Sequence, residues 1–196
     1  MFRAFNGSFF ALPPIETPRL LLRKITMADA RDIFAYSRDE EVARHVLWEA
    51  QRSIRDAREY VRYLQRLYRN DQPASWGIID KATGRLIGTV GFMSYSADHN
   101  SAEIGYSLAR DYWNRGIMTE AVRAVLRYAF EKMQLHRVEA QFELDNPASG
   151  RVMEKAGMQK EGVLRGRLYN KGRYVDVALY AILREDYMSK THGGHA

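Results

Sequence analysis

Residues 102–121 read AEIGYSLARDYWNRGIMTEA and predict a strand that leads through a glycine-containing turn into a helix. The first amides of a helix have no partner within it, and the helix dipole adds partial positive charge beside them. Together these groups can bind a phosphate. Gly116 lets the backbone approach a ligand closely, and Thr119 adds a hydroxyl group. One glycine before a helix is common, so this turn taken alone is more often plain structure.

A second segment, residues 145–157, reads DNPASGRVMEKAG and predicts a polar loop that opens a helix after a strand. The side chain of Asn146 can bond to backbone amides, and Ser149 falls in the first turn, where it can reach a ligand lying along the strand. The simpler interpretation is that Asn146 or Ser149 caps the helix.

Hydrophobic periodicity and turn residues predict the elements around these two segments. The predicted strands cover residues 19–23, 75–80, 86–92, 102–108, 137–144, 163–169 and 174–183. The predicted helices cover residues 27–37, 54–68, 119–133 and 148–156, the first of them capped by Thr26. The order βααβββαβαββ indicates an α+β fold, a mixed and mostly antiparallel twisted sheet with helices on both faces.

The length and composition indicate one globular domain. The chain has 196 residues, 46% hydrophobic and 28% charged, and we expect an N-terminal extension at 1–16, one domain at 17–187 and a disordered tail at 188–196. Four phenylalanines in the extension favour packing on the domain or on a partner subunit. The net charge of +6 fits either anionic partners or a solvated basic surface.

The absence of cysteine excludes a disulfide scaffold, a zinc-thiolate site and a cysteine nucleophile, and it agrees with a cytoplasmic protein. The five histidines have no spacing that suggests a metal site, although His45 could line an acceptor pocket. No apolar run is long enough to span a membrane, so we expect no membrane partner.

The two segments together resemble the GNAT superfamily of acetyl-CoA-dependent N-acetyltransferases, and most closely its RimJ/RimL-type branch. The resemblance covers about Thr17 to Leu183, and the order of elements agrees with it. The widespread pattern in this superfamily is Gln/Arg-x-x-Gly-x-Gly/Ala. Here Trp113 and Met118 replace its first and last residues, which leaves the backbone amides in place but can change the shape beside the pyrophosphate.

The resemblance implies that acetyl-CoA binds between two strands that separate, those at 102–108 and 137–144. The backbone of Tyr106 to Leu108 would bond the pantetheine arm, and the Leu108 amide would polarise the thioester carbonyl. The residues expected to bind the cofactor are Tyr106, Ser107, Leu108, Trp113, Asn114, Arg115, Gly116, Ile117, Met118, Thr119, Asn146, Ser149, Arg151 and Lys155.

Acetyl transfer to an amine also needs a base and an acid. Glu103 is the candidate base, acting directly or through a water, and the alternative is that it pairs with a cation on the sheet. Ser149 is the candidate proton donor to the departing thiolate, with Tyr106 as the alternative donor. A cap or a cofactor hydrogen bond is the competing role for Ser149.

The sequence leaves the acceptor open, because a fold does not determine a substrate. The leading hypothesis is the N-terminal α-amine of a protein, of the ribosomal-protein type, and its first alternative is a small amine such as a polyamine or an aminoglycoside. A protein acceptor requires an open groove between residues 44–48 and 170–173, whereas a small amine favours a closed, acidic pocket. A third hypothesis is a non-catalytic basic module that binds RNA or the ribosome, but the basic residues are dispersed and we expect no direct nucleic-acid contact. The aromatic N-terminal arm is compatible with a homodimer.

Overall fold

A mixed sheet with the strand order β1-β2-β3-β4-β5-β6-β8-β7 forms the centre of the computed structural model, which describes residues 11–192. All neighbouring strands are antiparallel except β5 and β6, which are parallel. The strands are β1 (Ile15–Glu16), β2 (Leu20–Arg23), β3 (Ser75–Asp80), β4 (Leu86–Ser96), β5 (Ser101–Leu108), β6 (Arg137–Glu143), β7 (Gln159–Asn170) and β8 (Arg173–Leu183). The α+β fold with a mostly antiparallel sheet is confirmed.

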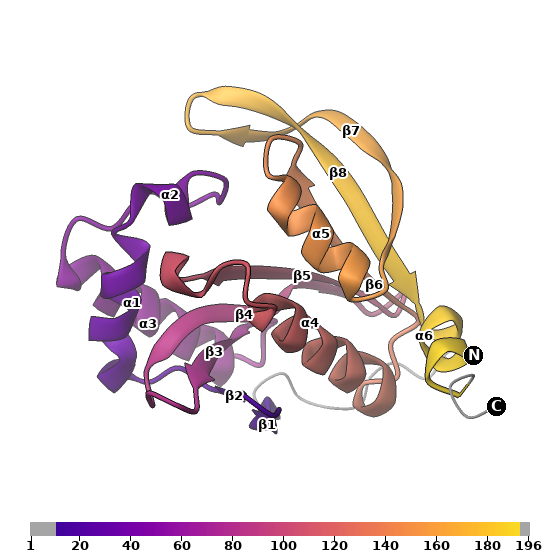
Figure 1. The fold of residues 1–196 in the computed structure, drawn as a ribbon, viewed down its shortest axis with the longest axis horizontal. Helices are drawn as coiled ribbons and strands as arrows, with labels where there is room; N and C mark the ends of the chain where they lie inside the picture. The colour runs from indigo at the N-terminus through magenta and orange to yellow at the C-terminus, as the bar shows by residue number, and fades with distance from the viewer. Residues whose placement is uncertain (1–10, 193–196) are drawn as a thin grey trace.

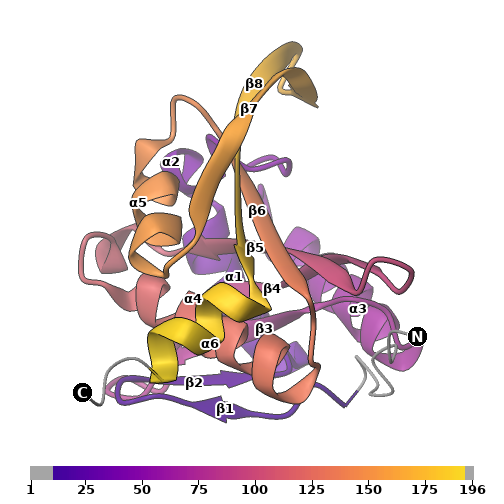
Figure 2. The ribbon, with the colours of Figure 1, turned by 90° about the vertical axis from the view of Figure 1, so that its right-hand side faces the viewer.

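Helices cover both faces of this sheet, with α4 and α5 on one side and α3 on the other (Figure 2). The helices are α1 (Ala30–Ser37), α2 (Glu40–Ala43), α3 (Ile54–Arg69), α4 (Ile117–Arg127), α5 (Pro147–Lys155) and α6 (Arg184–His192). A π-helical turn, Tyr128–Lys132, extends α4. Within residues 11–192, no helix has the length and apolar character needed to cross a membrane.

The two ends of the chain compare differently with the sequence predictions. Residues 11–16 pack on the sheet, because Leu12 is buried and Trp76 donates its indole N–H to the Pro13 carbonyl at 2.8 Å. The four phenylalanines of the extension lie outside the described residues. Helix α6 continues to His192 where a disordered tail was expected from residue 188, and residues 193–196 lie outside the described part.

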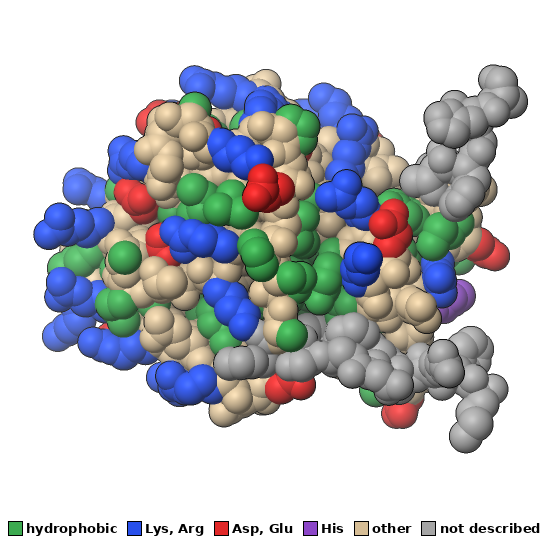
Figure 3. Space-filling model, turned by 90° about the horizontal axis from the view of Figure 1, so that it is seen from below, with side chains coloured by type: hydrophobic (Ala, Val, Ile, Leu, Met, Phe, Trp, Pro, Cys, Tyr) green, Lys and Arg blue, Asp and Glu red, His purple; other side chains and the backbone are tan. Residues whose placement is uncertain are grey.

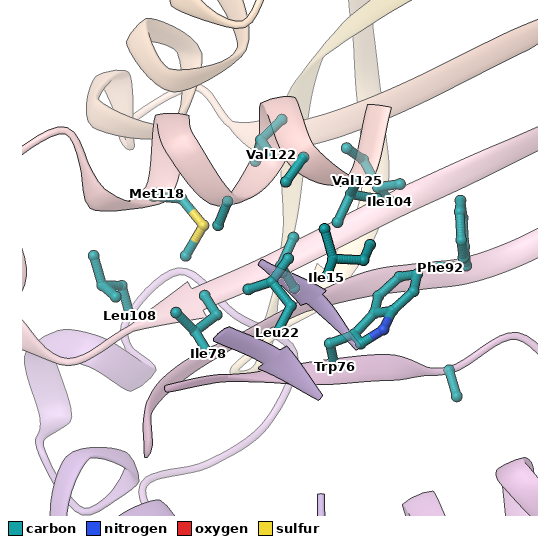
Figure 4. Close-up of a cluster of buried hydrophobic side chains, with 14 of the residues drawn as sticks. Ile15, Leu22, Trp76, Ile78, Phe92, Ile104, Leu108, Met118, Val122 and Val125 are labelled. Carbon is teal, nitrogen blue, oxygen red and sulfur yellow. The ribbon is translucent and has the colours of Figure 1, made fainter. Parts of the chain in front are cut away.

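The hydrophobic core fixes the position of α4 on the strands. Trp76 and Phe92 pack with ring centroids 5.8 Å apart, and the α4 side chains of Met118, Val122 and Val125 point toward the strands around them (Figure 4). All five side chains are at most 6% exposed. Because the first turn of α4 is anchored through Met118, the backbone amides at its start are held in one place.

The sheet opens in its middle, between β5 and β6. Among the described residues, these strands pair only where Ser101–Glu103 face Arg137–Glu139. Beyond Glu103, β5 continues along β4 to Leu108, whereas β6 continues along β8. The register of β4 shifts between Phe92 and Ser94, and Ser94 faces Glu103, so this irregularity lies where the separation starts. A bulge of this kind bends and twists a strand locally, which gives a physical reason for the separation.

The β7–β8 ribbon extends away from the body of the molecule, and its tip turns toward the segment that follows α2 (Figure 1). Strand β7 is almost entirely exposed along its length. The gap in the sheet and the tip of this ribbon position the candidate site.

Candidate active site

The backbone of β5 presents polar groups to the gap. The Ala109 amide donates to the Ile87 carbonyl of β4 at 2.7 Å. Backbone groups alternate in direction along a strand, so those of Tyr106 and Leu108 face away from β4 and toward the gap. Trp113 donates its indole N–H to the Leu108 carbonyl at 2.8 Å. The carbonyl of Leu108 therefore has a partner within the protein, and its N–H is available to a ligand in the gap. The geometry therefore supports the expected role of Leu108, which stays a prediction.

The turn before α4 has the geometry of an anion site. Gly116 has φ +72° and Asn114 has φ +58°, so the chain bends sharply here. The first hydrogen bond of α4 runs from the Glu120 amide to the Gly116 carbonyl at 3.1 Å, so the helix itself uses none of the amides from Ile117 to Thr119. The helix starts two residues earlier than predicted, because Gly116 is its N-cap residue.

The side chains of this turn mostly have other partners. Ile117 and Met118 are buried in the core, so only their amides can serve a ligand. The Trp113 indole bonds to β5, and the Arg115 guanidinium lies 5.7 Å from the ring centroid of Tyr112. Thr119, together with Gly116, lines a surface groove that Lys155 also lines. The structure thus fits a pyrophosphate held by backbone amides, with Thr119 and Lys155 beside them.

Tyr106 and Ser149, the two candidate proton donors, lie together. The Tyr106 hydroxyl donates to the Ser149 carbonyl at 3.1 Å, and the two hydroxyl oxygens are 2.8 Å apart. Burial raises the pKa of Tyr106 well above its ordinary value, so this hydroxyl keeps its proton. A Cβ on Gly150 would lie 2.6 Å from the ring of Phe142, so this glycine allows α5 to pack closely on β6.

Asn146 is the N-cap residue of α5 but makes no side-chain capping bond, and Ser149 bonds to Tyr106. The capping roles considered for these two residues are therefore not seen. Both residues instead line the cavity that is described below. Arg151 is exposed, and its predicted contact with cofactor phosphates stays a prediction.

Glu103 lies at the point where β5 and β6 separate. Gln141 of β6 donates its side-chain N–H to the Glu103 carboxylate at 2.8 Å. Burial raises the pKa of Glu103 above its ordinary value, and the bond from Gln141 opposes this effect only in part. Alternate residues of a strand point to opposite faces, so Glu103 and Tyr106 lie on opposite faces of the sheet. The candidate base and the candidate acid therefore lie on opposite sides of the sheet, and the gap between β5 and β6 connects the two sides.

The sequence did not predict Gln141 as a residue of the site, although its polar position in β6 was visible in the sequence pattern. The side chains of β6 alternate between apolar and polar, with Glu139, Gln141 and Glu143 in the polar positions. This alternation is typical of any half-exposed strand, and nothing in it identified Gln141 as the partner of Glu103.

One cavity of about 570 Å³ passes through the gap and joins both faces of the sheet. Ser149 and Met153 of α5 line it on one face, and Tyr36 and Tyr60 of α1 and α3 line it on the other. The charged side chains among its lining residues are Glu49, Glu103 and Glu143, with His45 beside them and no lysine or arginine. The charged groups of the cavity are therefore acidic, and aromatic side chains form part of its wall.

Three separate segments meet above the cavity, and we call them the roof. They are the α2–α3 loop with His45, the end of β6 with Glu143 and Asp145, and the β7–β8 turn with Asn170 and Arg173. Asn170 donates to Glu143, and His45 Nδ1 lies 3.4 Å from a Glu143 oxygen and 3.3 Å from an Asp145 oxygen. These groups have the spacing of a metal site, but Arg173 also lies 3.2 Å from Asp145. Because the carboxylates already have these partners, we assign no metal to them.

Glu103→Gln should gain stability relative to the wild type as pH rises. Folding raises the pKa of Glu103 above the unfolded value, so the folded state keeps a proton that the unfolded chain loses, and wild-type stability falls with rising pH through that interval. Glutamine has no such proton and can still accept the bond from Gln141. Urea unfolding of both proteins from about pH 4 to about pH 8 measures this difference.

Glu161→Gln is the matched control with the opposite sign. Hydrogen bonds from Arg137 at 2.7 and 2.6 Å lower the pKa of Glu161, so its ionised form stabilises the fold above the unfolded pKa. This variant should lose stability relative to the wild type as pH rises. Equal pH dependence in the two variants would contradict the burial assigned to Glu103.

Comparison with known proteins identifies the family. An acetyltransferase (GNAT) domain model matches residues 19–159. The uncharacterized N-acetyltransferase YoaA of Bacillus subtilis (strain 168) is 39% identical over 172 residues, which span 88% of this chain and 97% of YoaA. The uncharacterized N-acetyltransferase p20 of Bacillus licheniformis is 34% identical over 173 residues, which span 88% of this chain and 97% of p20.

The fold comparison agrees with the sequence comparison. The crystal structure of an acetyltransferase (GNAT family) from Bacillus anthracis superposes with a TM-score of 0.79 at 31% identity, covering 88% of this chain and 99% of that chain. Three observations point to acetyl-CoA as the cofactor: the gap between β5 and β6, the free amides in the first turn of α4, and this likeness. The chain belongs to the GNAT acetyltransferase family and is an acetyl-CoA-dependent N-acetyltransferase.

Proposed function

We propose that this enzyme acetylates the primary amine of a small molecule that is cationic at neutral pH. The observation that carries the proposal is the charge of the cavity. The protein has a net charge of +6, yet its cavity is lined by Glu49, Glu103 and Glu143 and by no lysine or arginine. Carboxylates and aromatic rings both attract an ammonium group. Lysines and arginines are instead scattered over the outer surface (Figure 3).

The roof also favours a compact acceptor. The Lys171 ammonium donates to the Val46 carbonyl at 2.7 Å and to the Trp48 carbonyl at 3.2 Å. These bonds join the two segments between which a protein acceptor would need an open groove. A further relative supports this choice: a spermidine N(1)-acetyltransferase of Vibrio cholerae is 24% identical over 173 residues, which span 88% of this chain.

The N-terminal α-amine of a protein is the second candidate acceptor. A ribosomal protein uS5-alanine N-acetyltransferase of Escherichia coli is 27% identical over 113 residues, which span 57% of this chain. This relative supports the RimJ/RimL-type branch, which stays a proposal, as do a homodimer and the absence of direct nucleic-acid contact. Membership of an acetyltransferase family favours catalysis over a non-catalytic basic module.

The proposed mechanism divides the proton transfers between the two faces of the gap. Acetyl-CoA supplies the acetyl group as a thioester. The Leu108 N–H faces the gap and donates to the acyl oxygen as negative charge develops there. On one face, Glu103 accepts, through intervening water, the proton that the amine loses as the new C–N bond forms and the C–S bond breaks. On the other face, the Tyr106–Ser149 pair gives a proton to the sulfur, and solvent restores both groups.

Glu103→Gln should lower kcat by about 10²-fold or more, because it removes the proton acceptor and keeps the shape of the site. Ser149→Ala and Tyr106→Phe should each lower kcat by a smaller factor, since either hydroxyl can replace the other in part. Steady-state kinetics test these values, and stabilisation by acetyl-CoA should persist in all three variants. Glu161→Gln should keep wild-type kcat, because Glu161 is not among the residues that line the cavity. Unchanged kcat in the three site variants would remove these role assignments.

An acceptor panel tests the proposed substrate class. We expect acetylation of at least one of putrescine, spermidine, phenethylamine and kanamycin with a kcat/KM at least about tenfold above the best tetrapeptide with a free α-amine. Thiol release measures all rates at one acetyl-CoA concentration, with mass spectrometry of each product as the check. A peptide that exceeds every small amine by the same factor would contradict the proposal and favour a protein acceptor.

A further inference from the structure

The turn at the tip of the β7–β8 ribbon holds a lysine in a backbone conformation that lysine disfavours. Asn170 and Arg173 form the last pair of the ribbon, and the two residues between them have φ +49° at Lys171 and φ +84° at Gly172. Two positive φ values mark a type I′ turn, in which Asn, Asp and Gly are the favoured residues. A side chain with a Cβ carries a steric cost in this left-handed region. Strain of this kind suggests a function for Lys171.

The ammonium of Lys171 bonds to the α2–α3 loop, more than 120 residues away in the chain. It donates to the carbonyls of Val46 and Trp48 at 2.7 and 3.2 Å and lies 3.4 Å from the side-chain oxygen of Asn170. Three acceptors around one ammonium satisfy its three N–H groups. The turn and the loop are thus fixed to each other at the residues that flank Leu47.

The α2–α3 loop supplies most of the cavity wall that is not built from helices or strands. Val46, Leu47, Trp48 and Glu49 all line the cavity, and Gln51 anchors the far end of the loop through its amide, which bonds to the Ser37 carbonyl at 3.0 Å. The near end has a backbone bond from the Val46 amide to the Ala43 carbonyl of α2 at 3.3 Å, and the ring of His45 meets the carboxylates of the roof. Between these two ends, the bonds from Lys171 are a direct link that holds the loop to the β7–β8 turn.

We propose that Lys171 is a specificity-determining residue, which holds the roof over the acceptor pocket and thereby restricts the acceptor to compact amines. This inference rests on the proposed function, because it concerns the same pocket. Lys171 acts through the loop and touches no reacting atom, so it is a positioning residue.

Electrostatics alone would give the opposite result when Lys171 is replaced. Removing a positive charge from the roof of an acidic pocket makes the pocket more negative, which should lower KM for a cationic amine. Loss of the bonds to Val46 and Trp48 frees the α2–α3 loop, which should raise KM for the amine. The sign of the change in KM therefore separates the two explanations.

The test compares Lys171→Gly and Lys171→Asn with the wild-type enzyme. Both residues suit a type I′ turn, so the ribbon should fold at least as well and the thermal midpoint should not fall. We expect KM for the best small amine of the panel to rise about three- to tenfold, the range expected for lost hydrogen bonds. KM for acetyl-CoA should stay within about twofold, and the best tetrapeptide should gain in kcat/KM relative to the small amine.

Lys160→Asn is the matched control, since it removes an exposed lysine from the same ribbon at the end remote from the roof. It should leave both KM values unchanged. A KM for the small amine that is unchanged or lower in both Lys171 variants would overturn the role of Lys171, while the wild-type preference for small amines would stand. A wild-type enzyme that prefers tetrapeptides would instead overturn the proposed function.

Discussion

The separation of β5 from β6 is the constraint on which the rest of the site depends. Two parallel strands that pair for three residues and then diverge leave backbone N–H and C=O groups without a neighbouring strand in the middle of a sheet. Such groups are costly to bury without partners. In this protein the Trp113 indole bonds to the Leu108 carbonyl, and the Leu108 N–H lies on the side of β5 that faces the gap. An extended ligand with amide groups can replace the absent strand pairing, which connects the fold directly to its cofactor.

The candidate catalytic groups lie on opposite faces of the sheet at this gap, and the cavity and the cofactor groove differ in charge. The parity of residue numbers along β5 puts Glu103 on one face and Tyr106 on the other, and each is held by a neighbour across the gap, Gln141 and Ser149 respectively. The cavity is acidic, whereas the groove beside Gly116 is lined by more basic than acidic residues: Arg19, Arg123, Arg127 and Lys155 against Glu16 and Glu120. Under the proposed function, these charges direct a cationic amine to the cavity and an anionic cofactor to the groove.

The sequence predicted the local structure of the site, but it did not predict the side-chain contacts between segments that are far apart in the chain. The strand at 102–108, the glycine turn and the helix after it follow from short-range preferences, and the structure reproduces them with α4 starting at Ile117. The contact of Trp113 with Leu108 spans five residues but depends on the side-chain direction, which no sequence pattern gives. The contacts of Lys171 with Val46 and of Gln141 with Glu103 join segments more than 35 residues apart. In the proposed function these contacts close the acceptor pocket and position the candidate base, and only the three-dimensional structure shows them.

The most direct test of this account measures amide exchange along β5 with and without acetyl-CoA. The amide of Ala109 is bonded to Ile87 within the sheet and serves as the internal reference, because its protection should not depend on the cofactor. The account predicts that saturating acetyl-CoA slows exchange at the amides of Tyr106 and Leu108, which face the gap. Unchanged exchange at both amides in a protein shown to be saturated with acetyl-CoA would mean that the cofactor does not occupy the space between β5 and β6.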